Sequence, residues 1–263
     1  MRSRRSKLFS VGKTYGETPT EFSQQLHTIE EQVIMALQTP SHPFYPIDAI
    51  IEDYAPNEAP LLTILTTASL GATALLGTTW LLTGFKRPQI TTVDRIAILW
   101  FVLSGSIHCF FEGYFMIHHD RMASAQDFFG QLWKEYALSD SRYMTSDTLV
   151  LCMETITVLV WGPLCFLVAY FIATQHSLRH PFQIVVCMSH LYGDSLYYAT
   201  SLFDHYVHGI AYCRPEALYF WVYYFFMNFI WIVVPFYYLY QSMRTISAAF
   251  KTMGERSMQQ KAR

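Results

Sequence analysis

The stretch from Thr148 to Ala173 reads TLVLCMETITVLVWGPLCFLVAYFIA, and it decides the class of fold. Its one charged residue is Glu154. An α-helix needs about 20 mostly apolar residues to cross a hydrocarbon core about 30 Å thick, and this stretch is long enough to do so. We therefore predict a membrane-spanning helix here, with a kink at Gly162-Pro163 that neighbouring helices accommodate.

Four further stretches meet the same standard, and Tyr and Trp gather at several of their ends, as in an interfacial aromatic belt. They are residues 60–85, 96–117, 181–202 and 217–240. We therefore predict an all-α membrane protein: a polar N-terminal extension (1–59), a five-transmembrane-helix bundle (60–243) and a basic C-terminal tail (244–263). Within the extension, the helical periodicity at 17–38 fits either an amphipathic surface helix or a flexible tail with local helix.

The composition agrees with a membrane protein and argues against several other classes. Hydrophobic residues make up 52% of the chain and charged residues 14%, against about 25% charged residues in a typical soluble domain. The net charge of −2 gives no reason to expect a nucleic-acid partner. The cysteines show no CxxC spacing and most lie in apolar stretches, so we expect neither a disulfide framework nor a metal site.

Lysine and arginine residues near the predicted spans set the expected orientation in the membrane. With the N-terminus outside, the cytosolic segments hold Lys86, Arg87, Arg95, Arg179, Arg244, Lys251, Arg256, Lys261 and Arg263. Near the spans, the opposite side holds only Arg121, Lys134, Arg142 and Arg214. The basic cluster at the N-terminus is left out because it lies beyond the range in which charge sets topology. This asymmetry predicts a lumenal N-terminus and a cytosolic C-terminus.

Few ionisable side chains fall inside the predicted spans, where burying a charge costs at least ~2.5–3.5 kcal/mol. His108 and Glu112 lie four residues apart and share one helical face, and His190 and Asp194 have the same spacing. Acidic residues at this depth nearly always face the bundle interior or a cavity. Glu112, Glu154 and His108 therefore form a set that could exchange protons.

Other polar and aromatic residues have simpler explanations. Asn228 and Trp231 lie three residues apart, and hydrogen bonding between helices accounts for Asn228 as well as a functional role does. The aromatic run at 219–226 is more typical of packing and lipid anchoring than of a ligand site. Residues 134–135 and 142–143 lie in a loop, where we expect solvated charges.

Several contiguous strings resemble the emopamil-binding protein family, the sterol Δ8–Δ7 isomerases of the endoplasmic reticulum. The resemblance covers residues 96–240, with a looser fit over the first span. It rests on QLWKEYA (131–137), DSRY (140–143), CMETIT (152–157), WGPL (161–164), YGD (192–194), LYFW (218–221) and FMN (226–228), followed by Trp231 and Pro235. The chain departs from the animal members in its long N-terminal extension and in the loop at 200–214.

The resemblance implies a five-helix bundle with an intramembrane sterol cavity, and an isomerase that needs no cofactor. At the positions that match the family's functional residues, we assign His108, Glu112 and Glu154 as catalytic. We assign Thr157, Asn228 and Trp231 as substrate-binding. Tyr143 and Asp194 lie inside the matching strings and are added to the substrate-binding set. The expected partners are the sterol, lipophilic amines as inhibitors and membrane lipid, with homodimerisation left open.

The resemblance also suggests a mechanism. Moving a double bond from C8=C9 to C7=C8 needs a proton delivered to C9 and another removed from C7, with a carbocation at C8 between the two steps. Fixed negative charge must offset the cost of burying that cation, and the face of Trp231 can add cation–π attraction. We assign Glu112, supplied by His108, as the proton donor and Glu154 as the electrostatic partner and base; the reverse assignment is the alternative.

Two other functions are consistent with the same residues. An enzyme of the same fold could isomerise or cyclise another polycyclic terpenoid, keeping the acid pair but changing the lining of the cavity. A non-catalytic protein could bind sterol or a cationic amine without turnover, although the presence of all the matched positions argues against it.

Overall fold

The structure is a computed structural model that describes Gln24 and residues 42–262. From residue 42 to residue 262 every regular element is a helix. The prediction of an all-α protein is therefore confirmed for this part of the chain. The helix predicted at 17–38 lies outside the described residues, apart from Gln24.

The helices follow the predicted spans, but several of them are composite. α2 (Leu61–Lys86) is continuous, whereas the second span consists of α3 (Thr92–Ser106), η1 (Ile107–Glu112), α4 (Gly113–His118) and η2 (His119–Ser124). The third span is built from α6 (Thr148–Ile156), η4 (Thr157–Trp161) and α7 (Gly162–Ala173). α8 (Arg179–Phe203) continues as η5 (Asp204–His208), and η6 (Leu218–Phe226) leads into α9 (Met227–Lys261). The elements η1, η4, η5 and η6 are π-helical, and η2 is a 3₁₀ helix.

Short polar side chains fix where three of the helices begin. The Thr91 hydroxyl accepts a hydrogen bond from the Asp94 amide at the start of α3, and Asp147 accepts one from the Val150 amide at the start of α6. Asp127 caps the short helix α5 (Phe128–Tyr136) in the same way. Each cap satisfies amide groups that have no partner inside the helix.

Four helical segments are long and apolar enough to cross a membrane: Leu61–Lys86, Thr92–Ser124, Thr148–Ala173 and Leu218–Lys261. In α2 only 6% of the most apolar window is buried by the rest of the protein, as expected for side chains that face lipid. The predicted fourth span is α8, whose 25 residues give it the necessary length. Its His, Gln and Asp side chains make it more polar than the other four segments.

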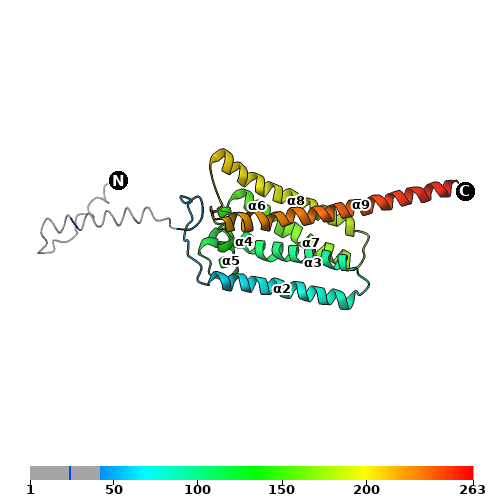
Figure 1. Cartoon of the computed structure of the whole chain (residues 1–263), viewed down its shortest axis with the longest axis horizontal. Helices are drawn as coiled ribbons and strands as arrows, with labels where there is room; N and C mark the ends of the chain where they lie inside the picture. The colour runs from blue at the N-terminus through cyan, green and yellow to red at the C-terminus, as the bar shows by residue number, and fades with distance from the viewer. Residues whose placement is uncertain (1–23, 25–41, 263) are drawn as a thin grey trace. The chain divides into compact units, whose positions relative to one another are not determined.

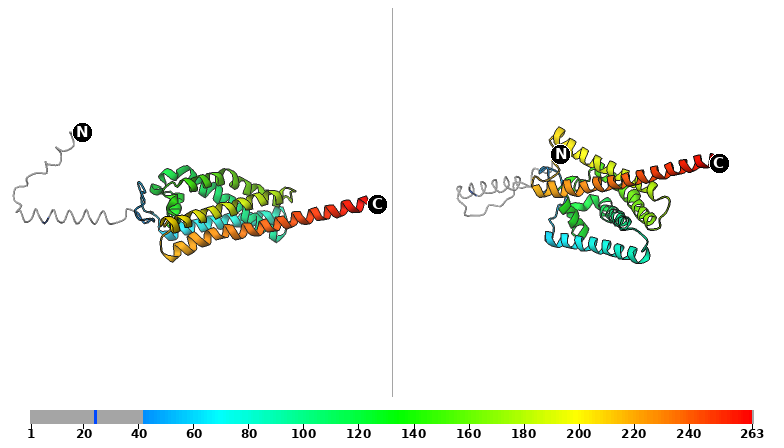
Figure 2. Two further views of the ribbon diagram at one scale, coloured as in Figure 1. Left: turned by 90° about the horizontal axis from the view of Figure 1, so that it is seen from above. Right: turned by 45° about the vertical axis from the view of Figure 1, so that its right-hand side comes forward.

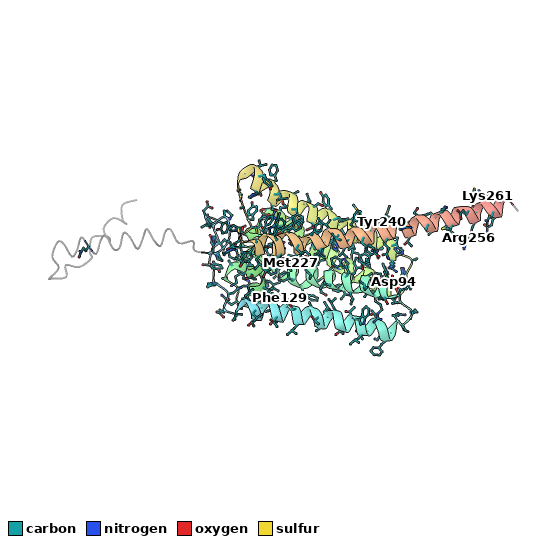
Figure 3. All side chains as sticks on the ribbon, viewed as in Figure 1. Asp94, Phe129, Met227, Tyr240, Arg256 and Lys261 are labelled. Carbon is teal, nitrogen blue, oxygen red and sulfur yellow. The ribbon has the colours of Figure 1, made fainter. Side chains whose placement is uncertain are left out.

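The long helices lie side by side, as Figures 1 and 2 show, with α2 at one edge beside α3. α3 also packs along α7, and α8 packs along α9. α9 runs on past the ends of its neighbours. Figure 3 shows Arg256 and Lys261 on this projecting part, which is exposed throughout.

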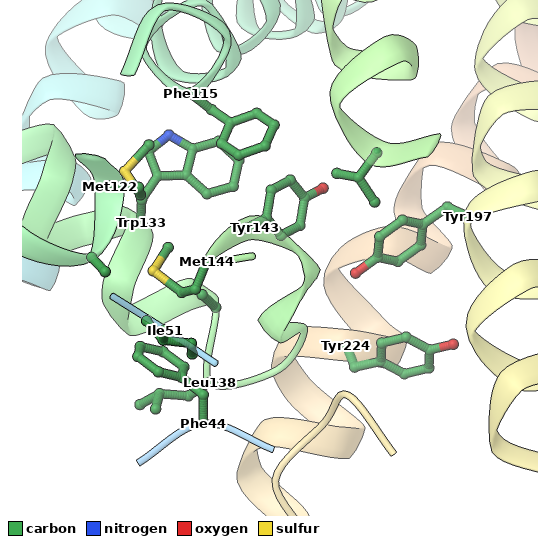
Figure 4. Close-up of a cluster of buried hydrophobic side chains, with 13 residues drawn as sticks. Phe44, Ile51, Phe115, Met122, Trp133, Leu138, Tyr143, Met144, Tyr197 and Tyr224 are labelled. Carbon is green, nitrogen blue, oxygen red and sulfur yellow. The ribbon is translucent and has the colours of Figure 1, made fainter. Parts of the chain in front are cut away.

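Two apolar clusters hold the described residues together. One, drawn in Figure 4, joins α4, α5 and η3 (Ser141–Tyr143), and it includes Trp133 and Phe115. Phe44 and Ile51, which precede α2, are buried in the same cluster. The other cluster lies between α3, α7, α8 and α9.

The prediction of solvated charges in the loop between the second and third spans is wrong. Lys134 is 3% exposed, Arg142 is 2% exposed and Asp140 is fully buried. The Lys134 ammonium donates to the Ala55 carbonyl at 2.7 Å, in the segment that precedes α2. That segment covers Lys134, whereas the Arg142–Asp140 pair is covered by α8, where Arg142 bonds to Thr200 and the Tyr197 carbonyl.

Candidate active site

Three of the π-helical turns, η1, η4 and η6, coincide with the predicted site residues. His108 and Glu112 lie in η1, Thr157 begins η4, and Asn228 lies two residues after the end of η6. π-helical turns are rare and often mark functional sites, because the extra residue in the turn re-aims the side chains beside it. In η4 the cause lies in the sequence. Pro163 has no amide hydrogen and its ring crowds the carbonyl four residues earlier, so the α-helical bond cannot form there.

Gly162 lets the second and third spans approach closely at this level. A Cβ atom on Gly162 would lie 2.5 Å from the Cys109 sulfur and 3.2 Å from the His108 Cβ. A Cβ atom on Gly105, which lies on α3 about one turn before Cys109, would be 3.1 Å from the Gly162 carbonyl oxygen. The two glycines thus place His108 and Glu112 against the helix that carries Glu154.

The two glutamates meet across this contact. The Glu112 and Glu154 carboxyl groups lie within hydrogen-bonding distance of each other. On one side, Glu112 Oε2 is 2.8 Å from His108 Nδ1. On the other side, the Tyr143 hydroxyl donates to Glu154 Oε1 at 2.8 Å. A hydrogen bond between two carboxyl groups requires one of them to hold a proton, so the pair can carry one proton and one negative charge.

Tyr143 is held in place by the loop that precedes α6. Its ring packs against Trp133 and Phe115, as Figure 4 shows, with ring centroids 4.6 and 5.1 Å away. Burial, followed in effect by the nearby Glu154 carboxyl, raises the pKa of the Tyr143 phenol well above its usual value. The phenol therefore stays protonated and acts as a donor.

The neighbouring Arg142 ties this loop to α8. Its guanidinium donates to both Asp140 oxygens, at 2.6 Å from Nη2 and 3.0 Å from Nε, and to the Thr200 hydroxyl at 2.9 Å. Burial alone would lower the pKa of Arg142, but Asp140 outweighs it and the pKa is raised. The buried pair is thus charged, and it fixes the backbone beside Tyr143.

Within residues 42–262, two other predicted substrate-binding residues form hydrogen bonds to groups outside the glutamate pair. Asn228 is hydrogen-bonded to the Tyr136 hydroxyl, from Nδ2 at 3.2 Å, and to the Tyr224 carbonyl at 2.7 Å. Thr157 donates to the Met153 carbonyl of its own helix at 2.9 Å. Tyr136 was not among the predicted residues; its position in the loop gave no sign that it would reach α9.

Trp231 and Asp194 are placed differently. The Trp231 ring packs on Trp100, with ring centroids 5.2 Å apart, and its indole N–H is buried without a protein partner. Asp194 Oδ2 is also buried without a protein partner. Leaving such an atom unpaired costs about 1–3 kcal/mol, so both side chains offer polar groups that a bound molecule could satisfy.

His190 joins the site from α8. Its Nε2 lies 3.1 Å from Nε2 of His108, and the two rings are tilted by 58°. The Cys165 sulfur lies 3.8 Å from the same His190 nitrogen. The i, i+4 spacing of His190 and Asp194 was the available signal, but it did not indicate which neighbour His190 would reach.

These three side chains also form the one group among the described residues that is spaced to hold a metal ion, since their ligand atoms lie within 4.8 Å of one another. The distance between the His108 and His190 nitrogens equals that of an ordinary N–H···N hydrogen bond. Because a shared proton accounts for this distance, we interpret the contact as a hydrogen bond.

Comparison with known proteins shows the family of the chain. Residues 128–242 match the family model described as EBP: EXPERA (EXPanded EBP superfamily). A 3-beta-hydroxysteroid-Delta(8),Delta(7)-isomerase of Cavia porcellus is 34% identical over 227 residues, which cover 85% of this chain and 97% of that protein. The chain belongs to the EBP family.

Other relatives carry two kinds of names, isomerase and synthase. A probable 3-beta-hydroxysteroid-Delta(8),Delta(7)-isomerase of Oryza sativa subsp. japonica is 30% identical, over 80% of this chain and 94% of that protein. A protoglabretal synthase of Citrus sinensis is 35% identical over 60% of this chain and 72% of that protein. The predicted family is therefore confirmed.

Proposed function

We propose that this EBP-family protein is a sterol Δ8–Δ7 isomerase, which moves the C8=C9 double bond to C7=C8. The observation that carries the proposal is the contact between Glu112 and Glu154, flanked by His108 and Tyr143. Two carboxyl groups that share one proton provide the acid and the negative charge that this isomerisation requires. The match to the relatives that are named isomerases extends over nearly the whole length of each of them.

We assign Glu112 as the acid and Glu154 as the charged partner, and the reverse assignment is the alternative. Tyr143 donates to Glu154, and donation to the charged form of a carboxyl group stabilises that form. Glu154 then keeps the negative charge, and Glu112 holds the proton that passes to C9. The cation at C8 is stabilised by Glu154 and by the face of Trp231, at about 2 kcal/mol for a desolvated cation–π contact. Glu154 then takes the proton from C7, and the shared hydrogen bond can return it to Glu112.

The membrane arrangement completes the proposal. We count α8 as a fifth span, since it lies along α9 with a length of 25 residues. Glu112 remains 14% accessible although it lies in the middle of a span, so its carboxyl group can be reached by a molecule beside the pair. The excess of basic residues near the spans on one side supports a lumenal N-terminus and a cytosolic C-terminus in the endoplasmic reticulum.

Sterol analysis tests the activity. Expressed in a strain that lacks its own Δ8–Δ7 isomerase, the chain should convert accumulated Δ8 sterol into Δ7 sterol, as measured by mass spectrometry. Growth in heavy water should place deuterium at C9. Glu112→Gln and Glu154→Gln should each abolish conversion, while Glu135→Gln, which removes a buried carboxylate outside the site, should not.

A second function is favoured by one specific observation, the similarity to a protoglabretal synthase. In that case the acid pair would act on another polycyclic terpenoid. Unchanged Δ8 sterol in the complemented strain, together with turnover of a terpenoid supplied to the same cells, would establish this second function instead.

A further inference from the structure

A line of hydrogen bonds runs through the site and ends on α8. It passes from Tyr143 through Glu154, Glu112 and His108 to His190, and so joins the third, second and fourth predicted spans. His190 is 6% exposed and takes no direct part in the chemistry proposed above. It is therefore a buried titratable group to which the proposed reaction assigns no role.

The contact between the two histidines constrains where protons lie. At 3.1 Å one Nε2 must carry a hydrogen and the other must present a lone pair. The other nitrogen of His108 is already committed to Glu112 at 2.8 Å. Each of the two nitrogens of His108 thus has one partner, and the His190 contact decides which tautomer His108 adopts for a given state of Glu112.

We propose that His190 is a positioning residue for the proton donor. When Glu112 is protonated it donates to His108 Nδ1, and His108 Nε2–H donates to His190. When Glu112 is ionised, His108 can instead hold its hydrogen on Nδ1, donate it to Glu112 and accept at Nε2 from His190. Each arrangement requires a different tautomer of both rings, so the two are alternative states of the site and not consecutive steps of one turnover. His190 can play both parts because its own Nδ1 has no protein partner, so either of its tautomers is available.

Without this contact, His108 Nε2 would be buried and unpaired. The imidazole could then turn over or adopt a mixture of tautomers, and Nδ1 would no longer be held against Glu112. The proposal rests on the isomerase function proposed above. It predicts a loss in turnover rather than in ligand binding, because the carboxyl pair that attracts a cation would remain intact.

Three substitutions separate a positioning role from a structural one. Leucine at position 190 removes both hydrogen-bonding functions, and His190→Leu should lower kcat about tenfold to hundredfold. Glutamine places an amide near the Nε2 position and can either donate or accept, so His190→Gln should restore kcat to within about threefold of the parent protein. His190→Asn carries the same amide one bond shorter and should behave like His190→Leu.

Two further measurements complete the test. KM for the Δ8 sterol and the Kd of a lipophilic amine should change less than about threefold in His190→Leu, since one hydrogen bond in the supporting structure has little effect on uniform binding. Cys187→Ala is the matched control, because Cys187 is buried on the same helix without touching the hydrogen-bonded line. It should keep the parent kcat.

The outcomes are distinct. A parent-like kcat in His190→Leu, or a His190→Gln protein no better than His190→Leu, would overturn the proposal. If the parent protein fails to isomerise sterols, the proposed function fails, and ¹⁵N chemical shifts of His108 still decide the positioning role. These shifts should report one hydrogen-bonded tautomer in the parent protein and a mixture in His190→Leu. A mixture already present in the parent would refute the role of His190 and leave the isomerase function untouched.

Discussion

Replacing Tyr143 by Phe removes one hydroxyl from the site and leaves the packing in place. The ring lies between Trp133 and Phe115 and is 4% exposed, so phenylalanine fits the same space. The lost bond is the 2.8 Å donation to Glu154. A hydrogen bond to a charged group contributes about 1.5–3 kcal/mol. With a factor of ten for every ~1.4 kcal/mol, kcat for sterol isomerisation should fall about tenfold to 150-fold.

The assay is conversion of a Δ8 sterol by the purified protein in lipid nanodiscs, with products separated by gas chromatography. Tyr223→Phe is the matched control, because the Tyr223 hydroxyl donates to Glu135 at 3.2 Å and takes no part in the hydrogen-bonded line. It should keep the parent rate. Equal rates for Tyr143→Phe and the parent protein would refute the reasoning, since Glu154 would then need no donor to carry its charge.

Three other predictions concern the frame of the site. Gly162→Ala should displace His108 and lower the isomerisation rate more than tenfold, because the new Cβ would lie 2.5 Å from the Cys109 sulfur. Gly193→Ala is the control, since a Cβ there meets nothing within 4 Å, and it should match the parent rate. Equal rates for the two variants would contradict the close approach of the helices. Arg142→Met leaves the buried Asp140 without its counter-ion at a cost of about 3–5 kcal/mol, so little folded protein should survive size-exclusion chromatography, and a parent-like yield would contradict it. Burial raises the pKa of Glu135, and a hydrogen bond from Tyr223 partly offsets the effect. The folded protein then binds a proton more tightly than the unfolded chain, so folding stability should fall as the pH rises from 4.5 to the raised pKa. Glu135→Gln should melt at a higher temperature than the parent protein at pH 7, and the difference should vanish below pH 4.5.

Much of the helical frame could be read from the sequence because lipid demands long apolar segments. The predicted stretch at 60–85 corresponds to α2, and the i, i+4 spacing of His108 and Glu112 led to the expectation that they share a face. Their side chains are hydrogen-bonded. Within a single helix, periodicity predicts which side chains are neighbours, and that inference needs no knowledge of the rest of the fold.

What the sequence could not show depends on how helices meet. Lys134 is buried because a preceding segment folds over it, and Arg142 is buried because it packs against α8. Local polarity reveals neither contact. The contact of His108 with His190 joins residues 82 positions apart. The π-helical turns also break the 3.6-residue period at the site, so a regular helical projection misplaces the residues that follow each one.

Equilibrium binding of a lipophilic amine to the parent protein, the two single glutamine variants and the double variant Glu112→Gln/Glu154→Gln tests most directly whether the carboxyl pair forms a cation site. The protonated amine stands in for the carbocation at C8. Removing one partner of a buried charge pair costs about 2–5 kcal/mol, so each single variant should bind the amine more weakly and the double variant about 30-fold more weakly or worse. A double variant that binds the amine as tightly as the parent protein would contradict the account.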